Sequence, residues 1–205
     1  SWQFTAHQPN VLLEFSDGTF GCLDGCCPAA SSVGLSFNSG STPDERALKF
    51  SIPFKGCIDG VLASIESFAS LAHFDLILYA ANGTTVVASR SFSGALYLNS
   101  DATLAFFSFP ETTIEANTTY YLSMKPTTVN NCRYNYWTVN ASGHKAVWPL
   151  GTNGCMSTRT DSGSWADTDT AIPMVYPRFN KFDDGVGGGA SLINSQQLVR
   201  QGWIG

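Results

Sequence analysis

The sequence predicts an all-β protein, an antiparallel, jelly-roll-like β-sandwich with extended N- and C-terminal arms. Three observations lead to this fold class. Charged residues make up only 13% of the 205 residues, whereas Gly, Ser, Thr and Asn are abundant, as in turn-rich β domains. Short apolar stretches recur roughly every 8–15 residues, as strands do in sandwich folds. No helical repeat separates these stretches, so neighbouring strands are expected to be antiparallel.

Three regions are predicted along the chain. Residues 1–30 form a Cys-rich N-terminal arm, in which NVLLEF (10–15) is the one predicted strand. The rest of this arm, SDGTFGCLDGCCPAASS, consists mainly of turn-forming residues. The sandwich domain is expected over residues 31–179, and a glycine-hinged C-terminal arm over residues 180–205.

The first half of the sandwich domain contains three strand signals. In ALKFSIPF (47–54) every second residue is apolar, which is typical of a half-buried strand. Residues 57–68 are apolar enough for a strand, although a helix fits them as well. Residues 73–92 contain two apolar runs around Asn82 and Gly83. Asn-Gly readily takes the positive φ angles of a tight turn, so this stretch predicts a β-hairpin.

The second half of the domain continues the pattern. TLAFFSFP (103–110) predicts a further strand, and side chains alternate in character over residues 120–125. The stretches at 133–140, 155–160 and 171–179 complete the series. The total is roughly eight to ten strands, which is typical of a sandwich or jelly roll.

The stretch RYNYWTVN contains the best candidate binding surface. In an extended strand Tyr134 and Tyr136 lie on one face, and Arg133 and Trp137 lie on the other. One of the two faces must contact the core. The other presents aromatic surface that either stacks on a sugar or packs on a neighbouring subunit. Packing in the core or an interface is the more ordinary interpretation.

The cysteines favour disulfides over free thiols, because their number is even and the chain carries little charge. They are Cys22, Cys26, Cys27, Cys57, Cys132 and Cys155. Two pairings are considered, one from the first three cysteines to Cys57 and one between Cys132 and Cys155, and the sequence leaves the connectivity open. Zinc is disfavoured, since the C-x3-C-C cluster has no partner motif. The three histidines, His7, His73 and His144, are isolated.

No enzyme motif occurs, since the sequence lacks G-x-S-x-G, H-E-x-x-H and a phosphate-binding loop. The expected protein therefore has no catalytic residues, no cofactor and no metal. Asp167 and Asp169 form a D-x-D pair that, with Asp161, is a distant match to a Ca²⁺ site. Turn capping is the commoner role of such acids. Trp165, in the same loop, is expected to cover an end of the sandwich rather than to bind a ligand.

Charge and hydropathy exclude two kinds of partner. The net charge is −5, and Arg178 and Lys181 are the nearest approach to a basic cluster, which argues against nucleic-acid binding. No apolar run approaches the length of a membrane-spanning helix. No signal peptide follows Ser1, although a signal removed earlier would leave the same pattern. The sequons at Asn82, Asn117 and Asn140 are explained by chance in a chain this rich in Asn, Ser and Thr.

Two stretches resemble a known family. LYAANGT (78–84) and TIEANTTYYL (113–122) resemble lines that recur in β-sandwich modules of tailed-phage virion proteins. Residues 158–175 and the FDDGVGGGA stretch are similar to the closing segment of the same family. The resemblance covers about residues 47–190. Relatives of these modules include bacterial surface and carbohydrate-binding modules.

The resemblance implies a structural role in a virion, as a head decoration (cement) protein, a head fibre or a tail-associated protein. The implied partners are the major capsid protein or other virion subunits, together with further copies of the chain in a homo-oligomer such as a trimer. The implied location is the virion, after assembly in the host cytoplasm. The alternative is a carbohydrate-binding module, either secreted or on a virion fibre or tail.

The C-terminal arm is expected to contact such a partner. KFDDGVGGGA (181–190) is a glycine-rich hinge, after which apolar residues return. Ordering such a segment costs roughly 1–2 kcal/mol per residue in backbone entropy, which burial on a neighbouring subunit offsets. The residues expected in this contact are Leu192, Ile193, Leu198, Val199, Trp203 and Ile204. The alternative is a disordered end or an added tail.

Overall fold

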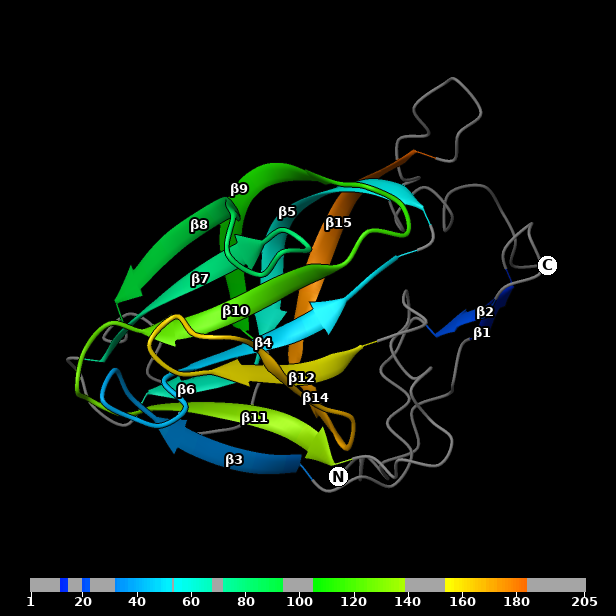
Figure 1. Ribbon diagram of the computed structural model, residues 1–205. Helices are drawn as coiled ribbons and strands as arrows, with labels where there is room; N and C mark the ends of the chain where they lie inside the picture. Colours follow the sequence, from blue (N-terminus) through cyan, green and yellow to red (C-terminus); the bar gives the residue numbers. More distant parts are fainter. Residues whose placement is uncertain are drawn as a thin grey trace, which may run out of the picture.

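The computed structural model describes residues 12–14, 20–22, 32–52, 54–67, 72–93, 105–138 and 154–183. Every regular element in these residues is a β-strand, and no helix occurs among them. The strands are Leu12–Glu14 (β1), Phe20–Cys22 (β2), Ser32–Phe37 (β3), Glu45–Phe50 (β4), Lys55–Ala63 (β5), Ile65–Ser67 (β6), His73–Tyr79 (β7), Val86–Ser93 (β8), Ala105–Ile114 (β9), Tyr120–Pro126 (β10), Cys132–Thr138 (β11), Cys155–Arg159 (β12), Ala166–Thr168 (β13), Ala171–Pro173 (β14) and Val175–Asp183 (β15). All strand pairs are antiparallel. The predicted fold class, an all-β antiparallel sandwich, is confirmed (Figure 1).

The first layer is a six-stranded sheet in the order β13-β12-β4-β10-β7-β8. Its side chains alternate between the core and the outer face, as two adjacent rows of paired residues show. Met156, Leu48, Leu122 and Leu78 are paired across four strands and all four are buried in the core. The next row, which contains Ala47, lies on the outer face. This period of two predicted a strand over residues 47–54, whereas the strand of the structure, β4, is Glu45–Phe50.

The second layer combines two smaller sheets, β14-β11-β3 with β6 beside β11, and β15-β5-β9. They meet where β5 passes into β6 and β14 passes into β15. At this point Ser64 N–H donates to Met174 O (2.9 Å), Met174 N–H donates to Asn135 O (2.9 Å), and Asn135 N–H donates to Ser64 O (3.1 Å). This ring of three hydrogen bonds satisfies backbone groups that would otherwise be buried unpaired at the break between the sheets.

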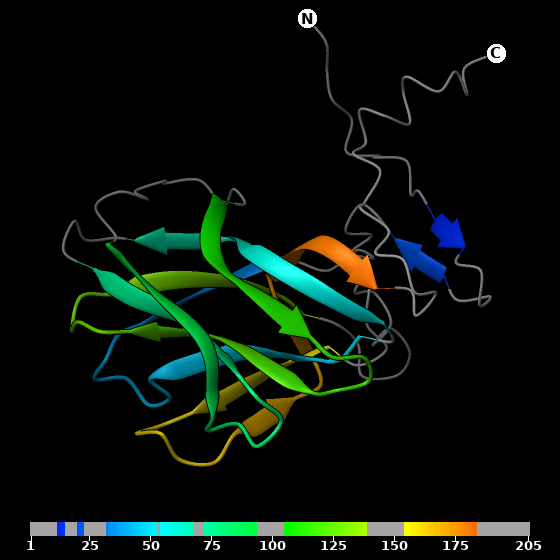
Figure 2. The same cartoon turned by 90° about the horizontal axis from the view of Figure 1, so that it is seen from above.

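The two layers enclose an aromatic core. Seen from above, β5, β9 and β15 lie on the opposite side of the molecule from β4 and β12 (Figure 2). Phe74, Phe92 and Phe107 come from β7, β8 and β9, and their ring centroids are 5.1–5.7 Å apart. At the same edge Arg90 donates from Nη1 to Oγ of Ser108 over 2.5 Å. These contacts join edge strands β8 and β9 of the two layers.

Several local predictions differ from the structure. The hairpin is present at β7 and β8, but only Gly83 of its turn has a positive φ. Asn82 acts through its side chain instead, since its Oδ1 accepts hydrogen bonds from the backbone N–H groups of Thr84 (3.0 Å) and Thr85 (2.9 Å). Residues 57–68, which left strand and helix open, lie in β5 and β6 where they are described. Strands β2, β3 and β13 were not expected.

Candidate functional site

Strand β11 contains the described residues of the RYNYWTVN candidate, 133–138, and lies at the centre of its sheet. The predicted alternation is present, since Tyr136 packs against the core and Arg133 lies on the other face. The Arg133 side chain crosses Gly34 so closely that a Cβ there would lie 1.8 Å from its Nε. The backbones of Tyr134 and Trp137 pair with β3, and their side chains lie outside the described part. On the described residues this stretch is therefore packed into the sheet.

The disulfide prediction is wrong for the three cysteines whose side chains are described. Cys57, Cys132 and Cys155 are free thiols. Cys132 pairs with Phe37 and points into the core. Cys155 precedes core-facing Met156, so it points to the outer face of the six-stranded sheet. The sheet lies between the two sulfurs, and a bond between them is excluded.

Burial raises the pKa values of these thiols. It raises the pKa of Cys132 to about 11, because a thiolate is disfavoured in apolar surroundings. Burial also raises the pKa of Cys57, with a further contribution from the Glu111 carboxylate. Burial likewise raises the pKa of Cys155, so all three remain mainly protonated at neutral pH. Of the remaining cysteines, Cys22 is described only in its backbone pairing, and positions 26 and 27 lie outside the described residues.

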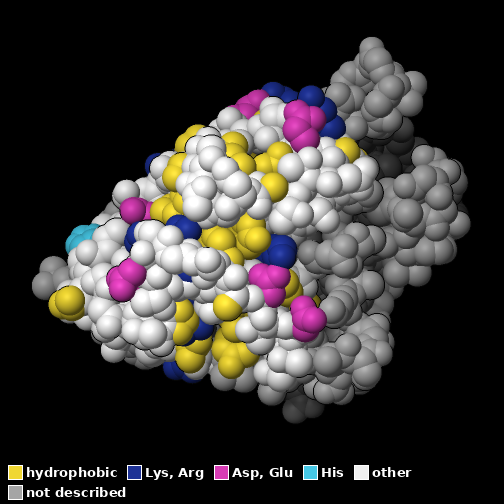
Figure 3. Space-filling model, viewed as in Figure 1, with side chains coloured by type: hydrophobic (Ala, Val, Ile, Leu, Met, Phe, Trp, Pro, Cys, Tyr) yellow, Lys and Arg dark blue, Asp and Glu magenta, His cyan; other side chains and the backbone are white. Residues whose placement is uncertain are grey.

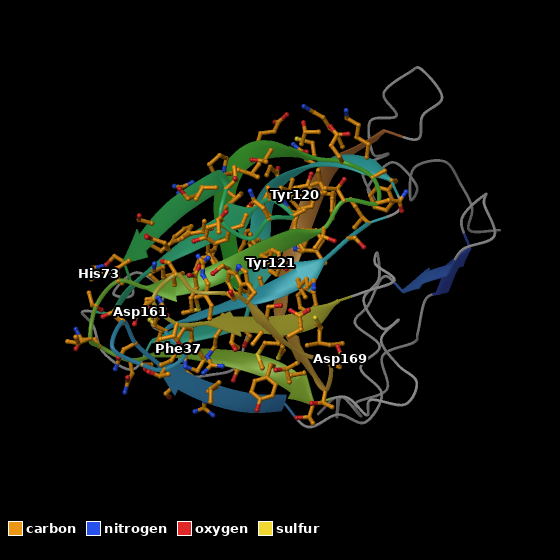
Figure 4. All side chains as sticks on the ribbon, viewed as in Figure 1. Phe37, His73, Tyr120, Tyr121, Asp161 and Asp169 are labelled. Carbon is orange, nitrogen blue, oxygen red and sulfur yellow. The ribbon has the colours of Figure 1, made fainter. Side chains whose placement is uncertain are left out.

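The three aspartates of the distant Ca²⁺ match are separated. Asp161 and Asp169 lie at opposite ends of the β12–β13 hairpin (Figure 4). Asp167 accepts hydrogen bonds from Lys49 Nζ and Ser157 Oγ, each over 2.5 Å. Burial opposes ionisation of Asp167, but these two donors outweigh it and lower its pKa. No group of three or more His, Cys, Asp or Glu side chains in the described part is placed to hold a metal ion.

Trp165 lies on the outer face of the six-stranded sheet rather than over an end of the sandwich. Its ring stacks on Tyr121, with centroids 5.1 Å apart and planes inclined by 14°. Its Nε1 donates to Gly83 O over 2.9 Å. Tyr121 therefore faces outward while its neighbour Tyr120 is in the core (Figure 4). The contacts tie the β7–β8 turn and the β12–β13 loop to the sheet.

A buried ion pair lies beneath this indole. Glu45 and Arg159 are 0% and 5% exposed, and Arg159 Nε donates to Glu45 Oε2 over 2.6 Å. Ser123 Oγ donates to the other carboxylate oxygen, also over 2.6 Å. The guanidinium carbon lies 4.6 Å from the Tyr79 ring centroid and 4.4 Å from that of Trp165. Glu45 and Arg159 are thus both buried and hydrogen-bonded, and Arg159 Nη1 also donates to Gly83 O over 3.0 Å. The cluster therefore stabilises the sheet and exposes no reactive group.

The outer face of β15-β5-β9 is different, because it exposes an aromatic ring. Tyr176, Leu62 and Phe106 pair in one row across the three strands. Tyr176 and Leu62 are half-buried, whereas Phe106 is 41% exposed. The Phe106 ring lies over Gly60, where a Cβ would approach its Cε2 to 2.1 Å. Glycine is thus required beneath the ring.

Arg178 completes this surface. Its guanidinium carbon lies 4.3 Å from the Phe106 ring centroid. It donates from Nε and Nη2 to the two carboxylate oxygens of Asp59, over 2.8 and 2.6 Å. The bond from Arg178 lowers the pKa of Asp59, and the same bond raises the pKa of Arg178. We call the surface formed by Asp59, Gly60, Leu62, Phe106, Tyr176 and Arg178 the Phe106 face.

Charges on this sheet balance. Strands β5, β9 and β15 contain three basic and three acidic residues, namely Lys55, Arg178, Lys181, Asp59, Glu111 and Asp183. Lys181 Nζ contacts Glu111 Oε1 over 2.5 Å, and Lys55 contacts Glu115, just beyond β9, over 2.9 Å. The chain as a whole carries −5, so its excess negative charge lies elsewhere. Figure 3, viewed from the side of the six-stranded sheet, shows acidic, basic and hydrophobic side chains interspersed there as well.

The Phe106 face was not predicted from the sequence, although one signal for it is present there. Two adjacent phenylalanines in a strand point to opposite faces, so Phe106 and Phe107 cannot both be in the core. The pairing of Asp59 with Arg178 has no comparable signal, because 119 positions separate them.

The C-terminal arm residues 192–204 that were expected to contact a partner lie outside the described part, as do His7, His144 and Asn140. Of the two described sequon residues, Asn82 and Asn117, Asn82 uses its amide within the turn, where Nδ2 donates to Thr85 Oγ1 over 2.7 Å. No known protein family matches the chain, and a search of curated proteins finds no match.

In the described part of the chain, no helix has the length and apolar character needed to cross a membrane.

Proposed function

We propose that this protein is a structural component of a tailed-phage virion, most specifically a capsid decoration (cement) protein that binds the shell as a homo-oligomer. Its partners are then the major capsid protein and other virion subunits, and its location is the virion. The resemblance of residues 78–84 and 113–122 to phage β-sandwich modules is the starting point.

The single observation that carries the proposal is the Phe106 face. An exposed ring, held in place by Gly60 and Arg178, lies on a sheet whose charges sum to zero. Interface centres are rich in aromatic residues and arginine and poor in unbalanced charge. In a chain of net charge −5, such a sheet adds no net charge that would repel an approaching protein surface.

The proposed mechanism is contact over area rather than chemistry. Full burial of a phenylalanine side chain stabilises a contact by about 1.5–3 kcal/mol. A rigid sandwich repeats this small gain at every copy in a regular shell, and an arm that reaches a neighbouring subunit adds to it. The shell is thereby held together by many weak contacts.

The test is reassembly on particles that lack the protein. Full-length chain is expected to bind such particles and to raise the temperature at which they release DNA. A chain lacking residues 185–205 and the Phe106→Ser chain are both expected to bind at least tenfold more weakly. The Val129→Ser variant, which changes an exposed loop residue outside the Phe106 face, is the control. Equal binding by all four proteins would refute the proposed role of arm and face.

A carbohydrate-binding module is the second candidate, and the same ring favours it. Phe106 offers a flat apolar surface, with the hydrogen-bonding groups of Arg178 and Asp59 beside it. Sugars stack on such rings in binding modules. Saturable binding to one glycan on an array, lost in Phe106→Ser or in Trp137→Ala, would support this candidate over the structural one.

A further inference from the structure

We infer that Arg90 closes the opening between edge strands β8 and β9 and keeps this side of the sandwich from pairing with a strand of another molecule. In the described part of the chain, β8 pairs with β7 alone and β9 pairs with β5 alone. An edge strand presents backbone N–H and C=O groups that are not paired within its own sheet, so it is a template for such association. The inference goes beyond the proposed function and does not rest on it.

Strand β8 has few of the usual safeguards of an edge strand. The opposite edge of its sheet, β13, has only three residues. In the sheet β15-β5-β9 both edge strands contain a proline, Pro177 and Pro110, which donates no hydrogen bond to an added strand. Strand β8 has eight residues and no proline, and it exposes Val86 (51%) and Val87 (42%). Its bulge lies at Val87, and residues 88–93 pair with β7 in regular register.

Arg90 occupies a core-facing position in this regular stretch. It is paired with Leu76, which is fully buried in the core, and side chains of paired residues lie on the same face of a sheet. Its neighbours on that face are half-buried Ala88 and buried Phe92. The arginine therefore interrupts an apolar row at the margin of the core. Inward-pointing charged residues on edge strands are one way in which β proteins prevent edge-to-edge pairing.

The guanidinium of Arg90 extends across the opening to β9, which lies next to β8 (Figure 1). Its Nη1 donates to Oγ of Ser108 over 2.5 Å and to the backbone O of Ser108 over 3.3 Å. The Ser108 carbonyl, on the edge strand β9, thus already has a donor. A strand added to β8 at this point would separate Arg90 from Ser108 and remove its charge from water, which is unfavourable.

The test compares self-association of full-length variants in solution. Arg90→Val removes the charge and completes the apolar row. The double variant Arg90→Val/Val87→Lys lacks the same contact but returns a positive charge to the same edge, where lysine opposes pairing. Lys55→Val is the matched control, because Lys55 is also an exposed cation with a partner but begins the central strand β5.

Circular dichroism checks that each variant is folded. Sedimentation velocity over a range of concentrations measures association, and hydrogen exchange with mass spectrometry locates the strands that become protected. Arg90→Val is expected to associate at a concentration at least tenfold below any at which the wild type does, with slower amide exchange in β8 or β9. The double variant and Lys55→Val should behave as the wild type does.

Three results would overturn the inference. The first is association of Arg90→Val at no lower concentration than the wild type. The second is association of the double variant or of Lys55→Val that is as strong as that of Arg90→Val, since the cause would then be general destabilisation or loss of charge. The third is protection on association that is confined to strands other than β8 and β9. No virion component is present, so these outcomes are independent of whether the protein belongs to a capsid.

Discussion

Asn135 donates a hydrogen bond from Nδ2 to Oγ of Ser64 over 2.9 Å, and both residues are buried. This bond lies inside the ring of backbone hydrogen bonds where the two sheets of the second layer meet. Strands β5 and β15 lead from this junction to the Phe106 face. The position of the face relative to the rest of the sandwich therefore depends on a polar contact in the interior.

Asn135→Leu is expected to lower the free energy of unfolding by about 1–3 kcal/mol, because it leaves the Ser64 hydroxyl buried without its partner. Urea denaturation gives the value. Asn131→Leu is the matched control, because Asn131 accepts its hydrogen bond from Asn38 in an exposed turn, and a change within about 0.5 kcal/mol is expected there. Equal changes in the free energy of unfolding for the two substitutions would show that the Asn135–Ser64 bond contributes no more to stability than an exposed hydrogen bond.

Arg159→Leu should be among the most destabilising substitutions in the sandwich. It removes the guanidinium that neutralises the fully buried Glu45 carboxylate, and breaking a buried pair costs about 3–5 kcal/mol. The double variant Glu45→Leu/Arg159→Leu removes both charges, and we expect it to recover most of the loss. If the double variant were as unstable as the sum of the single variants, the ion pair would not be the cause.

The Asp59–Arg178 pair predicts a dependence of stability on pH. Because the pKa of Asp59 is lowered in the folded state, its contribution is present above the unfolded pKa, near 4, and is lost as the pH falls through the folded pKa. Asp59→Asn should lower the free energy of unfolding at pH 7 by about 0.2–1 kcal/mol, as for other exposed pairs. The difference from wild type should close on acidification.

The control for this pH effect is the same substitution in an Arg178→Gln background. Without the guanidinium, Asp59→Asn should change the free energy of unfolding little at any pH between 3 and 7. A difference that persists unchanged in this background would assign the effect to another partner of Asp59.

Cys132 should resist alkylation in the native protein. With its pKa raised to about 11 from an ordinary 9.0, the thiolate fraction at pH 8 is about a hundredfold lower than for a free cysteine. Peptide mapping after timed treatment with iodoacetamide gives the rate, and the protein unfolded in guanidinium chloride gives the reference rate. Recovery of Cys132 in a disulfide-linked peptide with Cys155 from native protein would contradict the arrangement of strands β11 and β12.

The sequence predicts the sandwich itself because its main strands alternate. Leu48, Phe50 and Leu122 sit at the spacing that the core requires. Strand β3, SVGLSF, was not predicted, although Val33, Leu35 and Phe37 alternate with small residues, and the structure shows that Gly34 is needed under the Arg133 side chain. Contacts between residues far apart in the sequence, such as Glu45 with Arg159, depend on the order of the strands in a sheet. The alternation of apolar residues along one strand does not reveal that order.

The disulfide prediction failed for a related reason. An even number of cysteines and low charge describe composition, whereas a disulfide needs two side chains that point toward each other at bonding distance. Cys132 faces the core and Cys155 faces outward, and this difference depends on how strands are assigned to layers. The sequence placed its candidate site on β11, where the side chains of Tyr134 and Trp137 lie outside the described part, and it gave no prediction for the exposed ring of Phe106 on β9.

The most direct test of the virion role is sedimentation of the source material on a density gradient, followed by mass spectrometry of the dense particle fraction. The account predicts that the 22.0 kDa chain sediments with a major capsid protein at on the order of hundreds of copies per particle, as expected of a protein that repeats over a shell. A chain that remains in the soluble fraction while the capsid protein sediments would contradict it.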